Sequence, residues 1–284
     1  FAYLPMFGLI IAFKDFKLQP GKGFLASLFA SDWAGFKNFN YFLTSNTFGM
    51  LLRNTLVYNV IFIILNLLIP VTLAIVINQL YSKIASKVYQ TLMFFPYFMS
   101  WVVVSYFVYA FLSPDGGLFN LIIESTGGEG VMWYSQPKYW PFILVFMSTW
   151  KGMGYNMVVY LASITGIDTS LYEAAILDGA TKWQQAWYIT IPTIRPMIIM
   201  MFILNIGHIF YSDFGLFYQV TQHIPKPLEG VASTFDTYIY QALMSNASIG
   251  RTAAAGLFQS VCCCVTVLIT NAIVSKLDPD SAII

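Results

Sequence analysis

Residues 172–180 read YEAAILDGA and residues 189–192 read ITIP, in and just after a break between two long apolar segments. The apolar segments, residues 139–164 and 188–211, each exceed the ~20 residues that a helix needs to cross a bilayer. The break itself, residues 165–187, is mildly amphipathic and too polar to lie in lipid. It therefore predicts a short helix–turn–helix at the membrane surface, joining two spans.

Single residues of the break favour this local structure. Asp168 or Ser170 can accept a backbone hydrogen bond as an N-cap and so start a helix that runs through Leu177. Gly179 tolerates a positive φ, which ends that helix. Residues 181–191 can then begin a second helix that leads into the next span. We expect the two helices to lie flat on the cytoplasmic face of the membrane.

The first of these helices carries residues that suit contact with another protein. Ala174 and Ala175 are small, so a partner's surface can approach the helix closely. Glu173 lies near the helix N-terminus, where a negative charge is favoured, and can pair with a basic residue of the partner. The alternative is an ordinary amphipathic interfacial loop, which the tripeptide EAA alone would favour. The DGA and ITIP residues at their spacing favour a docking element instead.

The composition of the whole chain predicts a membrane protein. Hydrophobic residues make up 58% of the 284 residues and charged residues 10%, whereas about a quarter of a soluble domain is charged. The apolar runs are far longer than the strands of a membrane barrel. We therefore expect an all-α, polytopic transmembrane bundle that forms a single domain over residues 1–284. Its six spans are predicted at residues 1–13, 54–80, 88–112, 139–164, 188–211 and 252–275. Because the sequence starts inside an apolar run, we expect the first span to be truncated, with its other half and a basic cytoplasmic end upstream of Phe1.

Two long segments are predicted to lie outside the lipid. Residues 14–49 mix glycine and charged residues with Phe and Trp, as an interfacial segment does, and residues 212–250 form a polar loop. Both are periplasmic if the break at 165–187 is cytoplasmic. The basic residues do not support this orientation, because the positive-inside rule prefers Lys and Arg in cytoplasmic loops. The five on the inner side would be Lys83, Lys87, Lys182, Arg195 and Lys276, and the eight on the outer side Lys14, Lys17, Lys22, Lys37, Arg53, Lys138, Lys226 and Arg251.

The residues of the break resemble the EAA loop of ABC-importer permeases. The pattern of that loop is roughly E-A-A-x-x-D-G-A followed by I-x-L-P, and Ile191 replaces its Leu. The resemblance implies a type I importer-permease fold in which the loop docks in a groove of an ATPase subunit. ATP-driven closure would then move the spans as a rigid body. The residues that the resemblance assigns to ATPase coupling are Glu173, Ala174, Ala175, Asp178, Gly179, Ala180 and Pro192.

Two N-terminal stretches extend the resemblance to the LplB-like subgroup of sugar-importer permeases. Residues 3–16 read YLPMFGLIIAFKDF, and residues 33–39 read WAGFKNF, which matches W-x-G-L-x-N-F with Phe36 in place of Leu. The resemblance implies a multi-pass inner-membrane subunit that imports an oligosaccharide or polysaccharide, with an acidic polymer such as alginate as a candidate. It further implies a distinct second permease subunit, two ATPase subunits that bind ATP and Mg²⁺, and a periplasmic or extracellular substrate-binding protein. The binding protein would dock on residues 14–49 and 212–250.

Polar residues within the predicted spans are candidates for a translocation pathway, because such groups are costly in lipid. Asn205, His208 and Ser212 follow the i, i+3, i+7 spacing of one helix face. Lys151 and Tyr155 form an i, i+4 pair on the preceding span. Hydrogen bonds between helices, an interfacial position, or snorkelling of the Lys151 amine are the alternatives. The candidates for lining a central cavity are Lys151, Tyr155, Asn156, Asn205, His208 and Asp213.

Other function classes lack their sequence signals. The sequence has no Walker A glycine loop, so we expect a non-catalytic subunit without a cofactor of its own, with ATP hydrolysis in separate ATPase subunits. A lone His without Cys, Asp or Glu at ligand spacing does not predict a metal site. The net charge of +1 is far from the strongly basic charge that is typical of nucleic-acid-binding proteins. The alternatives are an ion-coupled secondary transporter, which needs acids within its spans, and a membrane-embedded enzyme, which needs clustered His or carboxylates.

Overall fold

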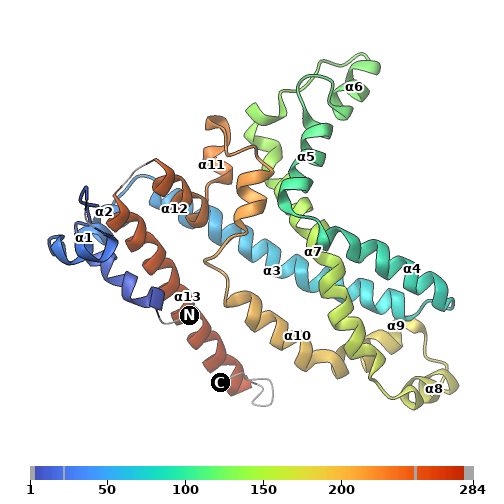
Figure 1. Ribbon diagram of the computed structural model, residues 1–284. Coiled ribbons are helices and arrows are strands. Elements are labelled where there is room, and N and C mark those ends of the chain that lie inside the picture. The colour runs from blue at the N-terminus through green and yellow to red at the C-terminus, as the bar shows by residue number, and fades with distance from the viewer. Residues whose placement is uncertain (1–3, 22, 246–247, 278–284) are drawn as a thin grey trace. The chain divides into compact units, whose positions relative to one another are not determined.

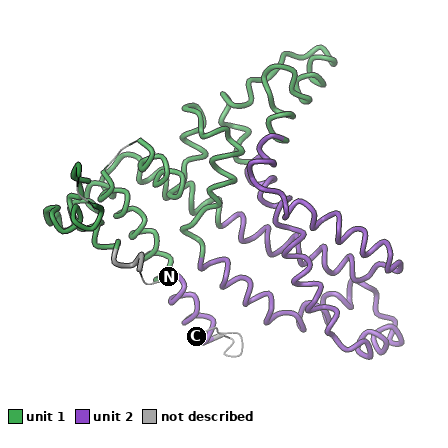
Figure 2. Tube along the Cα trace, viewed as in Figure 1, with its two compact units in different colours: residues 1–59, 107–141, 208–265 green, residues 60–106, 142–207, 266–284 purple. Residues whose placement is uncertain are grey.

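The predicted all-α class is confirmed for the part of the chain that the structure describes. The computed structural model describes residues 4–21, 23–245 and 248–277, where the regular structure is helical apart from one isolated β-bridge between Lys14 and Trp33. The chain divides into two compact units, shown in Figure 2. Residues 1–3 of the expected first-span fragment and Lys22 lie outside the described residues. Unit 1 comprises residues 1–59, 107–141 and 208–265, and unit 2 comprises residues 60–106, 142–207 and 266–284.

The helices follow one another along the chain with short connections (Figure 1). Most are α-helices. The 3₁₀ helix η1 has ten residues, and short 3₁₀ turns and two π-helical segments lie between the α-helices. In chain order they are η1 (Leu4–Phe13), α1 (Phe24–Ala30), α2 (Lys37–Leu43), α3 (Phe48–Asn78), α4 (Lys83–Phe94), η2 (Phe95–Phe98), α5 (Trp101–Leu112), α6 (Leu118–Ser125), η3 (Trp133–Ser135), η4 (Pro137–Tyr139), α7 (Trp140–Thr165), α8 (Thr169–Leu177), α9 (Lys182–Gln185), the π-helical η5 (Ala186–Thr190), α10 (Ile191–Ile206), the π-helical η6 (Gly215–Gln219), η7 (Lys226–Leu228), α11 (Glu229–Ala232), α12 (Phe235–Met244) and α13 (Ile249–Leu277).

Three helical runs among the described residues are long and apolar enough to cross a membrane: α3, the continuous run Lys182–Ile206, and α13 over Ile249–Lys276. A fourth candidate is the pair formed by α4–η2 and α5, which is bent by 99°. The span predicted at residues 88–112 is therefore present as a bent pair of helices rather than as one helix. Pro96 lies in η2, shortly before the break at Met99 and Ser100, and it lacks an N–H for the helix while its ring crowds the preceding turn.

The span predicted at residues 188–211 also ends earlier than expected. Helix α10 ends at Ile206, and residues 207–210 form turns. Glycine at 207 lowers the helical propensity there. Beyond it, in unit 1, the Asn59 side-chain amide donates to the carbonyls of Ile209 at 2.9 Å and Tyr211 at 2.8 Å, so this backbone is bonded to α3 instead.

The core of unit 2 is formed by α3, α7 and α10. Tyr172 and Ile189, from the break between two predicted spans, pack against this core. The helix–turn–helix is therefore joined to the long helices by apolar contacts as well as by the chain. The buried core residues are Val71, Ala74 and Ile77 of α3, Met157, Tyr160, Leu161 and Ile164 of α7, Ile167 after α7, and Ile194 of α10.

Gly154 lets the backbone of α7 contact the end of α4 directly. A Cβ atom built at Gly154 would overlap the carbonyl group of Met93 and lie 2.7 Å from the Cα atom of Phe94. Because the neighbouring atoms are backbone, they cannot rotate away as a side chain would. This close approach places the junction of α4 and η2 beside the middle of α7.

We expect Gly154→Ala to destabilise the protein, because overpacking against a rigid neighbour costs about 1–3 kcal/mol. The thermal unfolding midpoint of the purified protein in detergent should fall. The matched control is Gly152→Ala, whose new Cβ would meet only the Asn66 Oδ1 atom at 3.5 Å, an ordinary contact. Equal midpoints for the two variants would contradict the close backbone approach.

In unit 1, the first half of α3 binds the segment that follows α10. The Asn54 amide donates to the carbonyl of Ser233 at 2.9 Å, and the Tyr58 hydroxyl donates to that of Val231 at 2.9 Å. The Asp236 carboxylate accepts bonds from the Ser212 N–H at 2.6 Å and from the buried Gln259 amide at 3.1 Å. Residues 212–244 are thus a folded part of unit 1, bonded to α3 and α13.

Candidate functional site

The helix–turn–helix predicted in the break is present as α8 and α9. The Asp168 carboxylate accepts the Ser170 N–H at 3.0 Å, which is the predicted N-cap. This hydrogen bond holds the pKa of Asp168 below its ordinary value. At the other end, Gly179 has φ +78° and the Ala180 N–H donates to the Ala175 carbonyl at 2.8 Å, as in a Schellman motif. The predicted start and end of this helix are confirmed.

The second helix begins with a capping box. Thr181 Oγ1 accepts the Gln184 N–H at 3.3 Å, and the Thr181 N–H donates to Gln184 Oε1 at 2.7 Å. The T-x-x-Q spacing at residues 181–184 is the sequence signal for this cap. It marks the start of the second helix, which the EAA pattern alone does not mark. The helix continues through π-helical η5 into α10, where Pro192 lies in the first turn. The predicted lead into the next span is confirmed.

The side chains of α8 are largely exposed. Glu173 and Ala174 are exposed and Ala175 is half-buried. Two large apolar residues at the end of the helix are exposed as well, Ile176 and Leu177, the latter 88%. Asp178 and Gly179 are exposed, and Ala180 is half-buried. Six of the seven residues predicted to meet an ATPase therefore lie on α8 and the turn that follows it, on a surface that combines carboxylates with small and apolar side chains, whereas Pro192 lies at the start of α10.

Polar contacts fix this surface to the long helices. The hydroxyls of Tyr172 and Thr190 lie 2.9 Å apart, which joins α8 to η5. The Gln79 side-chain amide donates to the Lys182 carbonyl at 3.1 Å, and the Lys182 amine donates to the Gln79 carbonyl at 3.1 Å. This reciprocal pair joins α9 to the residue after α3. Neither residue carries a recognisable motif, because the two are 103 positions apart.

Two of the predicted pathway residues, Lys151 and Tyr155, lie in one cluster with Tyr97 of η2. The Lys151 amine donates to the Tyr97 carbonyl at 2.9 Å and lies 5.3 Å from the ring centroid of Trp101. The ring of Tyr155 stacks on that of Tyr97, with centroids 4.6 Å apart. Both tyrosine rings are partly exposed. The cluster therefore combines a cation with stacked aromatic rings. The Lys151 amine lies within the ~6 Å limit for a cation–π contact.

The remaining predicted pathway residues do not share one helix face. The Asn205 amide bonds back to the Met201 carbonyl of its own helix at 2.7 Å. His208 and Asp213 lie beyond the end of α10, so the face predicted for Asn205, His208 and Ser212 is wrong. The Asp213 carboxylate accepts the Leu216 N–H at 3.2 Å. Asn156 and Asn205 belong to unit 2, whereas His208 and Asp213 belong to unit 1.

Comparison with protein families gives one match over most of the chain. The family described as "Binding-protein-dependent transport system inner membrane component" matches residues 66–279. Two permeases of Bacillus subtilis (strain 168) are similar over nearly the whole length. The polygalacturonan/rhamnogalacturonan transport system permease protein YteP is 34% identical, over 97% of this chain and 83% of YteP. Protein LplB is 34% identical, over 99% of this chain and 85% of LplB.

Solved structures give the same result for the fold. A chain of a bacterial ABC transporter involved in the import of the acidic polysaccharide alginate has a TM-score of 0.86 and 33% identity, covering 98% of this chain and 91% of its own. A chain of the alginate transporter in complex with an alginate pentasaccharide-bound periplasmic protein has a TM-score of 0.85 and 32% identity, covering 98% and 89%. The predicted type I importer-permease fold is confirmed by this similarity.

Proposed function

The chain belongs to the family of binding-protein-dependent transport system inner membrane components, and from this premise we propose that it forms half of the pathway by which an ATP-driven importer takes up an acidic saccharide. The observation that carries the proposal is the EAA-type sequence folded into two short capped helices with an exposed surface. Such a surface is what a permease needs to receive movement from a separate ATPase.

The surface of α8 and the following turn is the proposed ATPase contact. Small side chains at 174 and 175 allow the partner to approach closely, and Glu173 offers a charge for a basic residue. Leu177 gives apolar area, which stabilises a contact when it is removed from water. The coupling residues are Glu173, Ala174, Ala175, Asp178, Gly179 and Ala180, with Pro192 at the start of α10.

Six membrane spans are part of the proposal. Beyond the three long apolar runs and the bent pair α4–α5, they include α7 and the segment η1. Helix α7 has 26 residues, enough to cross a bilayer. Its charged residue, Lys151, bonds within the protein to the Tyr97 carbonyl, as an ionisable group in a membrane helix is expected to do. Residues 165–187 are cytoplasmic in this topology, and residues 14–49 and 212–250 are periplasmic.

An acidic oligosaccharide or polysaccharide is the proposed substrate. The names of relatives support this class, because polygalacturonan and alginate are both acidic polysaccharides. The cluster of Lys151, Tyr97 and Tyr155 supports it chemically. A lysine amine can pair with a sugar carboxylate, and aromatic faces pack against the C–H faces of sugar rings. The proposed pathway residues are Lys151, Tyr155, Asn156, Asn205, His208 and Asp213.

The proposed assembly needs further chains. A second, distinct permease completes the pathway, two ATPase subunits bind ATP and Mg²⁺, and a periplasmic or extracellular binding protein delivers the saccharide. This chain is then a non-catalytic subunit without a cofactor of its own. The test is to reconstitute the whole complex in proteoliposomes. We expect the saccharide-loaded binding protein to stimulate ATP hydrolysis, with uptake that requires ATP on the ATPase side. Uptake by this chain alone, driven by an ion gradient, would favour a secondary transporter instead.

The reciprocal bonds between Gln79 and Lys182 give a separate prediction about coupling. Gln79→Leu combined with Lys182→Met removes both bonds, each of which contributes about 0.5–1.5 kcal/mol. We expect the double variant to hydrolyse ATP normally but to import about threefold fewer saccharide molecules per ATP, because α9 is then joined less tightly to α3. The measurement is the ratio of uptake to hydrolysis in proteoliposomes. The control is Gln90→Leu, which loses a bond to Ser86 within α4. An unchanged ratio in the double variant would rule out a coupling role.

A further inference from the structure

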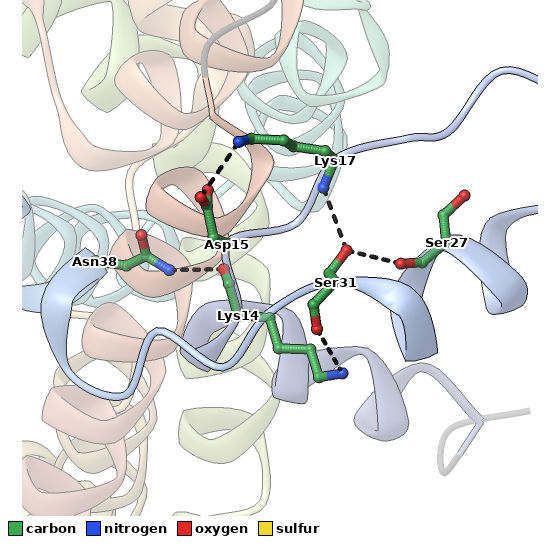
Figure 3. A network of polar contacts seen from close by, with 6 residues as sticks. All are labelled: Lys14, Asp15, Lys17, Ser27, Ser31 and Asn38. Atoms are coloured by element: carbon green, nitrogen blue, oxygen red, sulfur yellow. Dashed lines mark hydrogen bonds and ion pairs between the residues drawn. The ribbon is translucent and has the colours of Figure 1, made fainter.

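The segment 14–49 of unit 1 has a fixed backbone frame, part of which Figure 3 shows. The Lys14 amine donates to the carbonyls of Leu28 at 2.7 Å and Ser31 at 3.2 Å. The amide of Asn38, a buried residue, donates to the carbonyls of Ala12 at 2.9 Å and Lys14 at 3.0 Å. These bonds join η1, α1 and α2 into one small fold rather than a loose interfacial loop.

The start of α13 closes one side of this fold. A Cβ atom built at Gly250 would lie 2.5 Å from the Lys14 carbonyl oxygen and 2.8 Å from Asn38 Nδ2. Only glycine therefore permits this approach. The next residue, Arg251, places its guanidinium carbon 3.6 Å from the ring centroid of Tyr41, a close cation–π contact.

Between these parts lies a cavity of about 360 Å³, at the lower end of the ~300–1,000 Å³ range of small-molecule pockets. Two aspartates and two basic residues line it, so its charge is balanced. Two partly exposed rings face it as well, including Trp33, which is 65% exposed. The lining includes Asp15, Asp32, Trp33, Lys37, Tyr41 and Arg251.

Half of the charged groups in the cavity are not used by the fold. Asp15 pairs with Lys17 at 3.5 Å, and Arg251 packs on Tyr41. By contrast, the Asp32 carboxylate and the Lys37 amine have no hydrogen-bond or ion-pair partner among the described residues. An acceptor and a donor are therefore available in a hollow with aromatic walls.

The chemistry of this lining points to one class of ligand. A simple anion would gain little electrostatic binding energy in this cavity, because the two aspartates offset the two basic residues. An apolar ligand would leave the charged groups desolvated. The described residues contain no group of three metal-ligating side chains. A sugar ring fits: its hydroxyls can donate to Asp32 and accept from Lys37, while its C–H face packs on the exposed Trp33 ring.

We propose that this cavity is a saccharide-binding site on the outer side of the membrane, sharing no residue with the proposed pathway. Its size suits a short part of a sugar chain. The inference rests on the proposed function for the class of ligand and for the periplasmic position of residues 14–49. Such a site would hold an arriving saccharide near the permease before or during delivery.

The test measures direct binding to the assembled permease–ATPase complex in lipid nanodiscs, without binding protein or ATP. The probes are a pentasaccharide of uronic acids, a neutral glucose pentasaccharide and inorganic phosphate. Binding of each probe is measured by calorimetry. We expect both saccharides to bind and phosphate not to compete. Trp33→Ala should weaken saccharide binding by about tenfold, because it removes an aromatic contact face. Asp32→Asn combined with Lys37→Gln should weaken it by at least about threefold.

The matched control is Phe29→Ala, which removes an exposed aromatic ring of α1 that does not line the cavity. It should bind saccharide as the natural protein does. Equal saccharide affinity in Trp33→Ala and in the natural protein would overturn the proposal. So would competition by phosphate. In a parallel titration with the binding protein, a Trp33→Ala variant that loses affinity only for that protein would also overturn the proposal, because the cavity would then be a polypeptide contact. ATP-dependent uptake is measured separately. Its absence in the natural complex, with saccharide binding intact, would contradict the proposed function and leave the site standing.

Discussion

Replacing Glu173 with lysine is expected to abolish saccharide uptake while the protein still inserts into the membrane. Glu173 is exposed on α8, so its replacement disturbs no core contact. The lysine reverses the charge on the surface proposed to meet the ATPase. Like charges across an interface cost several kcal/mol, and ~3 kcal/mol corresponds to about a hundredfold in affinity. Co-purification of the ATPase subunit and ATP-dependent uptake should both fall by about this factor.

The control for this variant is Glu129→Lys, the same charge change at an exposed position in the connection between α6 and η3. It should assemble and transport normally. Glu173→Gln, which removes the charge without reversing it, should show an intermediate loss. If Glu173→Lys retains full ATPase association and uptake, α8 is not the ATPase contact.

The break between the two predicted spans could be predicted in detail because its structure is local. The N-cap at Asp168 and the positive φ at Gly179 depend on bonds that reach only a few residues along the chain. Interactions of such short range can be predicted from a few consecutive residues. The same holds for the capping box of Thr181 and Gln184, whose spacing is equally local.

The ends and bends of the long helices were harder to predict, because distant contacts decide them. Apolar composition predicts one span across Pro96 and another past Gly207, but the first is bent by 99° and the second ends at Ile206. The backbone after Gly207 bonds to Asn59, about 150 positions away in the sequence. A hydropathy pattern contains no information about such a bond.

The cluster of Lys151, Tyr155 and Tyr97 was also predictable only where its contacts are local in the sequence. The i, i+4 spacing of Lys151 and Tyr155 predicted their common helix face. The third member, Tyr97, lies 54 positions from Lys151 and comes from the aromatic stretch around Pro96, where the helix breaks. The segment before the bend in the predicted span thus places a ring and a carbonyl beside the one lysine of α7. An aromatic-rich sequence around a proline was the only signal for it.

Lys151→Met is expected to lower uptake of an acidic oligosaccharide by about tenfold or more, with a smaller effect on any neutral saccharide that the complex also imports. Methionine keeps the length and much of the apolar stem of lysine but removes the charge that would pair with a sugar carboxylate. The variant also loses the bond to the Tyr97 carbonyl and the contacts with the Tyr97 and Trp101 rings. An exposed cation–π contact contributes about 0.5–1 kcal/mol, so a modest loss of thermal stability should accompany the loss of uptake.

Two further variants separate a role in transport from a role in folding. Lys138→Met also removes a lysine from an aromatic ring, that of Tyr139 at 4.6 Å, but outside the proposed pathway. It should lose comparable stability and keep its uptake. Lys151→Arg keeps the charge and should recover much of the uptake of acidic saccharide. If Lys151→Met and Lys138→Met lower uptake equally, or if acidic and neutral saccharides are affected alike, Lys151 stabilises the α7–η2 contact without recognising the substrate. The stacked tyrosines would then be left as the candidate contact for the sugar ring, to be tested by Tyr155→Ala.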